Sequence, residues 1–168
     1  YIAPECGGID AAWNPDGTDK WKEGELVPMK DGLAASDNRV TARIMCDIND
    51  PNLLVDFARR CGIESALEAV PSLCLGTCDI SLFEMMEVYS VFPNAGYTTK
   101  PQFLLSIKDK NGITIQDFHQ QRNKVISDTV AYKMVYMMKG VVDSGTAASL
   151  KHRFSLDNIQ IAGKTGST

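Results

Sequence analysis

The end of the chain, Ile159 to Gly166, alternates apolar and small side chains, and this period of two is typical of an extended strand with one buried face. The run contains Lys164-Thr165-Gly166 and continues into Ser167. In such a strand Thr165 and Ser167 lie on one face, where their hydroxyls and the charge of Lys164 can bind an anion. Gly166 leaves the backbone open for a peptide to pair alongside. The run therefore predicts a strand that binds a carboxylate-bearing peptide, although Lys-Thr-Gly alone is more often part of an ordinary turn.

A second polar cluster, Ser36-Asp37-Asn38, lies inside a segment from Val27 to Ile48 whose apolar residues recur at helical spacing. Ser, Asp and Asn are favoured at helix N-termini, and the charge of Asp37 suits the positive end of a helix dipole. We expect the cluster at or near the start of a buried helix, where a hydroxyl and a carboxamide can face a cleft. Taken alone, the three residues are explained at least as well by helix capping.

Considered together and in this order, the two motifs are those that accompany a Ser-x-x-Lys nucleophile in β-lactamases and penicillin-binding proteins. Further blocks extend the likeness along the chain. They are Trp13 to Pro15, Gly24 to Lys30, Pro71 to Gly76, Ser81 to Met85, Tyr89 to Gly96 and Met138 to Ala147. Over nearly its whole length the chain resembles the transpeptidase domain of class A, or bifunctional, penicillin-binding proteins.

This resemblance implies an α+β fold: the mainly helical lobe of the penicillin-binding protein and serine β-lactamase-like transpeptidase fold, with a small hairpin and one strand of the antiparallel sheet. Residues 1–168 would form part of that domain, from before Ser36-Asp37-Asn38 to the Lys164 strand. No Ser-x-x-Lys occurs in the sequence; Ser106 and Ser149 are followed by lysine only two residues later, which is not one helical turn. We therefore expect a fragment of a longer protein, without the nucleophile segment and inactive alone.

The resemblance also implies a reaction and roles for individual residues. A serine outside this chain would attack the D-alanyl-D-alanine carbonyl of a peptidoglycan stem peptide, and an amine of a neighbouring stem would resolve the acyl-enzyme. The catalytic set in this chain would be Ser36, in the proton relay, Asn38, on the substrate amide, and Lys164, as electrostatic support in contact with Ser36. The substrate-binding set would be Asn38, Thr165, Gly166 and Ser167. The backbone N–H of Ser167 would form half of an oxyanion hole. Asp37 is the member of the motif whose role is least defined.

Other implications concern partners and location. The parent protein would be anchored in the cytoplasmic membrane with this domain on its periplasmic, extracytoplasmic side, would carry a glycosyltransferase domain, would associate with cell-wall synthesis proteins and would be a target of β-lactam antibiotics. No cofactor is expected. Two histidines and the absence of a Cys-x-x-Cys pair argue against metal binding, and a net charge of -4 argues against nucleic acid. For the five cysteines we expect buried free thiols, with room for one disulfide in an oxidising periplasm.

Two other functions remain open. A β-lactamase would share the motifs, but it also needs a carboxylate that activates water, and no Glu-x-x-x-Asn element lies between Ser36 and Lys164. A non-catalytic sensor or binding module could use the same fold, and then the parent protein would lack the serine or the lysine of the nucleophile motif.

Local patterns predict the remaining elements. We expect a helix over 52–61 after Asp50-Pro51, a central helix over 80–92, and a helix over 129–142 capped by Ser127-Asp128. Two strands, 103–107 and 113–118, should form a hairpin around Asn111-Gly112. Residues 145–147 are predicted to turn into a new helix start, and 149–158 to form a polar loop.

Overall fold

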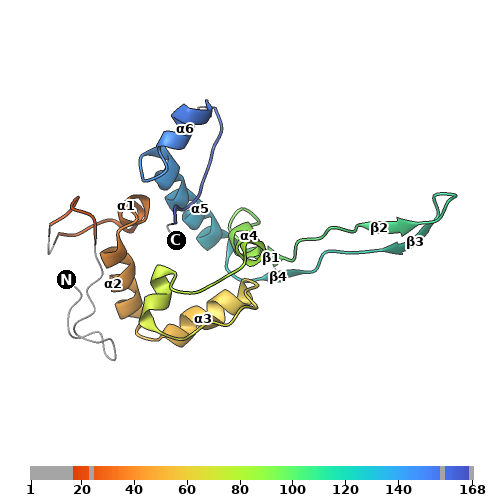
Figure 1. Cartoon of the computed structure of the whole chain (residues 1–168), viewed down its shortest axis with the longest axis horizontal. Coiled ribbons are helices and arrows are strands. Elements are labelled where there is room, and N and C mark those ends of the chain that lie inside the picture. The colour runs from red at the N-terminus through yellow and green to blue at the C-terminus, as the bar shows by residue number, and fades with distance from the viewer. Residues whose placement is uncertain (1–16, 23–24, 156–157, 167–168) are drawn as a thin grey trace.

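The computed structural model describes residues 17–22, 25–155 and 158–166. Helices of this part of the chain gather in one body, and a long arm of paired strands projects from it (Figure 1). The elements are α1 (Met29–Ala35), α2 (Asn38–Ile48), α3 (Pro51–Arg60), the 3₁₀-helix η1 (Pro71–Leu75), α4 (Leu82–Ser90), β1 (Tyr97–Thr99), β2 (Ser106–Lys108), β3 (Thr114–Asp117), β4 (Arg122–Lys124), α5 (Asp128–Asp143) and α6 (Ser149–Phe154).

Four helices begin at a side chain that accepts a hydrogen bond from a backbone N–H of the first turn, which satisfies one of the donors left free at a helix start. These caps are Asp37 for α2, Asp50 for α3, Ser81 for α4 and Ser127 for α5. The helices expected over 52–61 and 129–142 are confirmed as α3 and α5, each within one residue of the predicted bounds.

The body is held by two small apolar clusters. One consists of Cys61, Val91 and Val125, and joins the end of α3, the end of α4 and the segment after β4. The other consists of Val141, Val142 and Ala147, with Leu33 of α1 and Ile161 packed against it. The second cluster brings α1, α5 and the end of the chain together, and so it positions the segments that carry both sequence motifs.

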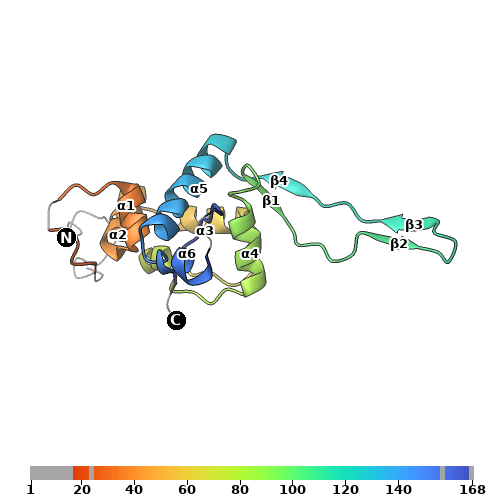
Figure 2. The same cartoon turned by 90° about the horizontal axis from the view of Figure 1, so that it is seen from above.

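The arm is a long hairpin whose outer part, with β2 and β3, stays clear of the helices, whereas β1 at its base lies beside α4 (Figures 1 and 2). At its base β1 pairs with β4, and further out β2 pairs with β3, both antiparallel. Gly112 has a φ of +83°, the left-handed conformation that the predicted turn requires. The predicted hairpin is confirmed with shorter strands, whereas the β1–β4 pair was not predicted, because neither strand alternates apolar and polar residues strongly enough to be recognised.

Helix α4 departs from the sequence-based expectation. The central helix expected over 80–92 is instead a surface helix whose apolar side is exposed and whose buried side carries two carboxylates, Glu84 and Glu87, at 9% and 5% exposure. The exposed apolar residues are Leu82, Phe83 and Met86. The expectation is wrong because apolar content alone does not say which face is buried, and hydrogen bonds to the two carboxylates turn their face inward.

The segment after α5 also differs. The polar loop expected over 149–158 contains α6, whose Lys151 forms an ion pair with Asp143, the last residue of α5. Residues 159–166, expected to be a strand, have no regular strand conformation in the described part of the chain. Strand geometry is stabilised by pairing with a neighbour, and no described segment pairs with this run.

Glu84 holds the start of α4 to the loop before it, and this contact should depend on pH. Its carboxylate accepts hydrogen bonds from Ser65 N and Oγ, Ser81 N and Oγ, and Glu64 N, at 2.6–3.0 Å. The hydrogen bonds from Ser65 and then Ser81 hold the pKa of Glu84 well below its usual range. A lowered pKa stabilises the fold above the ordinary value of 4.5, and this contribution shrinks as the pH falls below it.

We therefore expect Glu84→Gln to lower the midpoint of thermal unfolding at pH 7 by about 5 °C. The difference from the unmodified chain should become smaller below about pH 4, since protonation of Glu84 in the unfolded state then removes the advantage of the charge. Glu68→Gln, the same change at an exposed glutamate nearby, is the control and should leave the midpoint unchanged. An equal effect of both substitutions would contradict the role given to Glu84.

Candidate active site

The structure brings Lys164 and Ser36 into contact although they are 128 residues apart in the sequence. The Nζ of Lys164 donates a hydrogen bond to the Oγ of Ser36 at 2.6 Å and a second to the carbonyl oxygen of Thr165 at 2.9 Å. Both side chains are partly buried. The two sequence motifs therefore meet at a single point, which we take as the centre of the candidate site.

Ser36 owes its position to the way α1 ends. Its φ and ψ are 56° and 42°, a left-handed conformation that is uncommon for residues other than glycine and asparagine. The turn is closed by two backbone hydrogen bonds, from Ser36 N to Leu33 O at 3.1 Å and from Asp37 N to Gly32 O at 3.0 Å. The bend joins α1 to α2, and the Ser36 hydroxyl accepts the hydrogen bond from Lys164.

The side chain of Asp37 stabilises this bend through hydrogen bonds. It is 2% exposed, and its carboxylate accepts hydrogen bonds from Arg39 N at 2.9 Å, Arg39 Nη2 at 3.0 Å, and Thr18 N and Oγ1 at 3.1 Å each. Burial alone would raise the pKa of Asp37, but the hydrogen bonds from Arg39 and Thr18 outweigh it and lower the pKa to about 2. Asp37 is thus ionised, and its hydrogen bonds with Arg39 and Thr18 hold the middle residue of the motif, between Ser36 and Asn38, in place. The sequence suggested only that it suits a helix start.

The charge of Lys164 is not neutralised by any carboxylate in the described ranges, where the ion pairs involve other residues. Burial lowers the pKa of Lys164, because the ammonium group is partly removed from water. A partly desolvated cation that donates to a neutral hydroxyl stabilises an anion more strongly than a solvated one. This arrangement can support both proton transfer through Ser36 and the binding of a carboxylate.

The other predicted site residues are placed as follows. Thr165 is partly buried, and its Oγ1 lies 2.7 Å from the Oγ1 of Thr146. Asn38 begins α2 and is exposed next to Asp37. Gly166 is exposed, and a side chain added there would meet nothing within 4 Å in the described structure. Ser167 lies outside the described residues. The roles proposed for these residues stay predictions.

No function was predicted for the turn Gly145-Thr146-Ala147. In the structure this turn contacts both Ala34, at the end of α1, and Thr165. A Cβ at Gly145 would come within 2.2 Å of the carbonyl oxygen of Ala34, so only glycine fits there. Thr146 N donates to that same carbonyl at 3.0 Å, and Ala147 N donates to Val141 O at 3.0 Å. The turn therefore fastens the end of α5 to the last turn of α1, two residues before Ser36.

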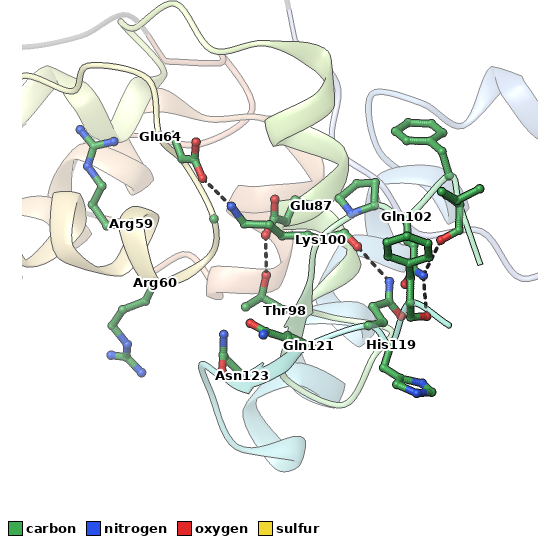
Figure 3. A pocket seen from close by; sticks show the side chains of 16 residues that line it. Arg59, Arg60, Glu64, Glu87, Thr98, Lys100, Gln102, His119, Gln121 and Asn123 are labelled. Atoms are coloured by element: carbon green, nitrogen blue, oxygen red, sulfur yellow. Dashed lines mark hydrogen bonds and ion pairs between the residues drawn. The ribbon is translucent and has the colours of Figure 1, made fainter. Parts of the chain in front are cut away.

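A separate hollow lies at the base of the arm. It has a volume of about 660 Å³ and is bordered by the end of α3, by Glu87 of α4, by Thr98 of β1 and Asn123 of β4, and by the segments that lead from these strands into the arm (Figure 3). Lys100 and Glu64 at its wall form an ion pair at 2.6 Å, and the Thr98 hydroxyl donates to Glu87 at 3.2 Å. None of the predicted site residues lines it. Because these polar groups are paired with each other, we assign this cavity no part in the chemistry.

The cysteines and the acidic residues offer no further reactive centre in the described part of the chain. Cys46 is disulfide-bonded, whereas Cys61, Cys74 and Cys78 are free thiols. Burial raises the pKa of Cys61 and of Cys74 to about 11, so both are protonated near neutral pH. No three His, Cys, Asp or Glu side chains in the described ranges gather closely enough to hold a metal ion. No helix there is both long and apolar enough to cross a membrane.

Comparison with known proteins agrees with this picture. Residues 10–168 match the family model of the penicillin binding protein transpeptidase domain. Penicillin-binding protein 1A of Neisseria meningitidis is 32% identical over 171 residues, which cover 98% of this chain and 21% of that protein. The chain belongs to the penicillin-binding protein transpeptidase family. It spans about one fifth of the length of this curated relative.

Solved structures show the same fold at low sequence identity. The crystal structure of penicillin-binding protein 1A from Haemophilus influenzae has a TM-score of 0.71 and 20% identity, covering 83% of this chain and 26% of that one. An imipenem acyl-enzyme complex of penicillin-binding protein A from M. tuberculosis has a TM-score of 0.61 and 18% identity, covering 71% of this chain and 33% of that one. The predicted fold class is confirmed: a mixed, mainly helical part of a penicillin-binding transpeptidase domain.

Proposed function

We propose that this chain is part of a peptidoglycan D,D-transpeptidase that acts through an acyl-serine intermediate. The observation that carries the proposal is the 2.6 Å hydrogen bond from Lys164 to Ser36, which joins the two motifs of a transpeptidase family across 128 residues. The family membership supports the reaction type, and the geometry supports the roles of these two residues in it.

In the proposed reaction a serine attacks the carbonyl carbon between the two D-alanines, the C–N bond breaks, and the terminal D-alanine leaves with a proton on its amine. An amine from a second stem peptide then attacks the ester and restores the serine. Since the Ser36 oxygen accepts from Lys164, its own proton is free to be donated, and it can pass a proton to the departing amine. Lys164 stabilises the negative charge that develops nearby.

The residues next to Lys164 fit the carboxyl end of the substrate. We propose that Thr165 and Ser167 hold the terminal carboxylate beside Lys164, and that Gly166 leaves the backbone free to pair with the peptide. Asn38 would hydrogen-bond the substrate amide from the other side, and Ser167 N–H would supply half of the oxyanion hole. This reaction needs no metal or cofactor, because the nucleophile, the proton relay and the charge come from side chains and backbone.

The nucleophile must come from elsewhere, since the sequence contains no Ser-x-x-Lys. We propose that residues 1–168 are a fragment of a longer, bifunctional synthase that contributes the serine helix, the rest of the sheet, a glycosyltransferase domain and a membrane anchor. The domain would then work on the periplasmic, extracytoplasmic side of the cytoplasmic membrane, together with other cell-wall synthesis proteins. β-Lactams would acylate it, as imipenem does in the complex of penicillin-binding protein A from M. tuberculosis.

Labelling of the full-length protein with a fluorescent penicillin tests the proposal. We expect one covalent, slowly hydrolysed adduct on a serine that lies outside residues 1–168 and is followed three positions later by lysine. Ser36→Ala should slow labelling about 10²-fold, because the proton relay is lost. Absence of any adduct would exclude the enzyme and leave a non-catalytic binding module, whereas rapid turnover of the penicillin would indicate a β-lactamase.

A further inference from the structure

We propose that Thr146 is a positioning residue that aims the Thr165 hydroxyl at the substrate carboxylate, an inference that rests on the proposed function. Thr146 belongs to the Gly-Thr-Ala turn, to which neither the sequence motifs nor the reaction gave a role. Its Oγ1 lies 2.7 Å from the Oγ1 of Thr165, which is hydrogen-bond distance for two hydroxyls.

The position of Thr146 is fixed by its backbone. Its N–H donates to the carbonyl oxygen of Ala34 at 3.0 Å, and the absence of a side chain at Gly145 allows this close approach. The neighbouring Ala147 is buried in the cluster formed with Val141 and Val142. The hydroxyl of Thr146 is therefore carried by a rigid turn that is attached to the helix ending at Ser36, although the hydroxyl itself reaches the surface.

The direction of the hydrogen bond follows from the chemistry of the ligand. A carboxylate only accepts hydrogen bonds, whereas a hydroxyl has one proton to donate and two lone pairs to accept with. To bind the substrate carboxylate, Thr165 must give its only proton to it. The bond between the two threonines must then run from Thr146 to Thr165. A donor at position 146 thus favours the one hydroxyl orientation of Thr165 that suits an anion, and it strengthens the bond that Thr165 makes in turn.

Both Ser36 at the end of α1 and the segment that carries Lys164 and Thr165 are thereby connected with the Gly145-Thr146-Ala147 turn. Lys164 contacts Ser36 directly, and Thr146 connects the neighbouring residue, Thr165, to the carbonyl of Ala34 two residues before Ser36. Thr146 does not reach Ser36 or Lys164 in any hydrogen bond of the described structure. It acts through Thr165, so its removal should affect recognition of the carboxylate and leave the proton relay unchanged.

The test is Thr146→Val in the full-length protein, a change that keeps the shape of the side chain and removes the hydroxyl. The probes are a penicillin with a free carboxylate and its methyl ester, and the measurement is the rate of acylation as a function of probe concentration. We expect the apparent binding constant for the carboxylate probe to weaken about three- to tenfold, with little change in the limiting acylation rate. The methyl ester should react with the variant as it does with the unmodified protein.

Three comparisons decide the outcome. Thr146→Ser, which restores a hydroxyl, should recover the preference for the carboxylate, and Thr114→Val, the same chemical change on the exposed strand β3, is the matched control. In a Thr165→Val background, Thr146→Val should have no additional effect. The proposal would be overturned if Thr146→Val weakened the binding of both probes equally and lowered the unfolding midpoint. It would also be overturned if the effects of Thr146→Val and Thr165→Val on binding of the carboxylate probe were additive. A protein that reacts with neither probe before any substitution would instead overturn the proposed function.

Discussion

Replacing Lys164 by methionine should slow β-lactam acylation of the full-length protein by about 10²- to 10⁴-fold. The ammonium group of Lys164 donates to Ser36 at 2.6 Å and is not paired with a carboxylate in the described ranges. Methionine keeps a long unbranched stem and removes only the charge and the donor. The measurement is the second-order rate constant with a fluorescent penicillin, together with the midpoint of thermal unfolding.

The stability of this variant separates a functional effect from a structural one. Partial burial of a lysine charge disfavours the folded state, so Lys164→Met should leave the unfolding midpoint equal or slightly higher. A variant that acylates at the normal rate, or one that loses activity only because it unfolds, would contradict the role of Lys164.

The same lysine should set the alkaline limit of activity. Burial lowers the pKa of Lys164 from the ordinary value of 10.5, so the ammonium form is lost at a lower pH than in a free lysine. Acylation should therefore decline on the alkaline side below pH 10.5. In Lys164→Arg, whose guanidinium stays charged, this decline should disappear, although the overall rate should fall because a planar guanidinium cannot replace an ammonium group in the same contact.

Asp37→Ala should lower the free energy of unfolding of the chain by about 3 kcal/mol, because it removes a helix cap and the acceptor of charge-assisted hydrogen bonds from Arg39. For a chain of this length that loss corresponds to a fall of about 6–12 °C in the unfolding midpoint. Urea denaturation followed by circular dichroism measures it. Asp56→Ala, at an exposed position in the middle of α3, is the control and should have a small effect.

The pH dependence of this effect has a definite sign. The pKa of Asp37 is about 2 in the folded chain and 3.8 ordinarily, so the carboxylate stabilises the fold above pH 3.8. The contribution, about 2 kcal/mol by this shift, is lost as the pH falls from 3.8 toward 2. The difference in the free energy of unfolding between the unmodified chain and Asp37→Asn should disappear over that pH interval. A gap that stays constant from pH 7 to pH 2 would show that the ionised carboxylate is not what stabilises the bend.

Local signals in the sequence predicted those elements whose start and end are decided by neighbouring residues. Asp50-Pro51 begins α3 and Ser127 caps α5, because a cap needs only a side chain near its own backbone. Asn111-Gly112 forms the predicted turn of the arm for the same reason. A helix start was predicted at 145–147, but residues 149–154 were expected to be loop; the extent of α6 was missed because its ion pair with Asp143 comes from another element.

Burial was less predictable than helix formation. Helix α4 has enough apolar residues for a central position, yet Glu84 and Glu87 are its buried side chains. Their burial is stabilised by partners such as Ser65 and Thr98, which precede and follow the helix in the sequence and meet it only in the fold. A pattern within one helix cannot report a hydrogen bond to another segment.

The sequence by itself determined the chemical groups of this protein: the hydroxyl of Ser36, the amide of Asn38, and the lysine and threonine at the end of the chain. It also determined the family, because the motifs occur in order along the whole chain. The contact of Lys164 with Ser36 was implied by the family resemblance, and the structure supplies its geometry. Only the tertiary structure decided that Asp37 clamps the bend between α1 and α2 and that Thr146 contacts Thr165. The contacts of Lys164 and Thr146 join segments brought together by the packing of α1 on α5 and by the cluster around Val141, and Asp37 reaches Thr18, 19 residues before it; no local pattern specifies such long-range contacts.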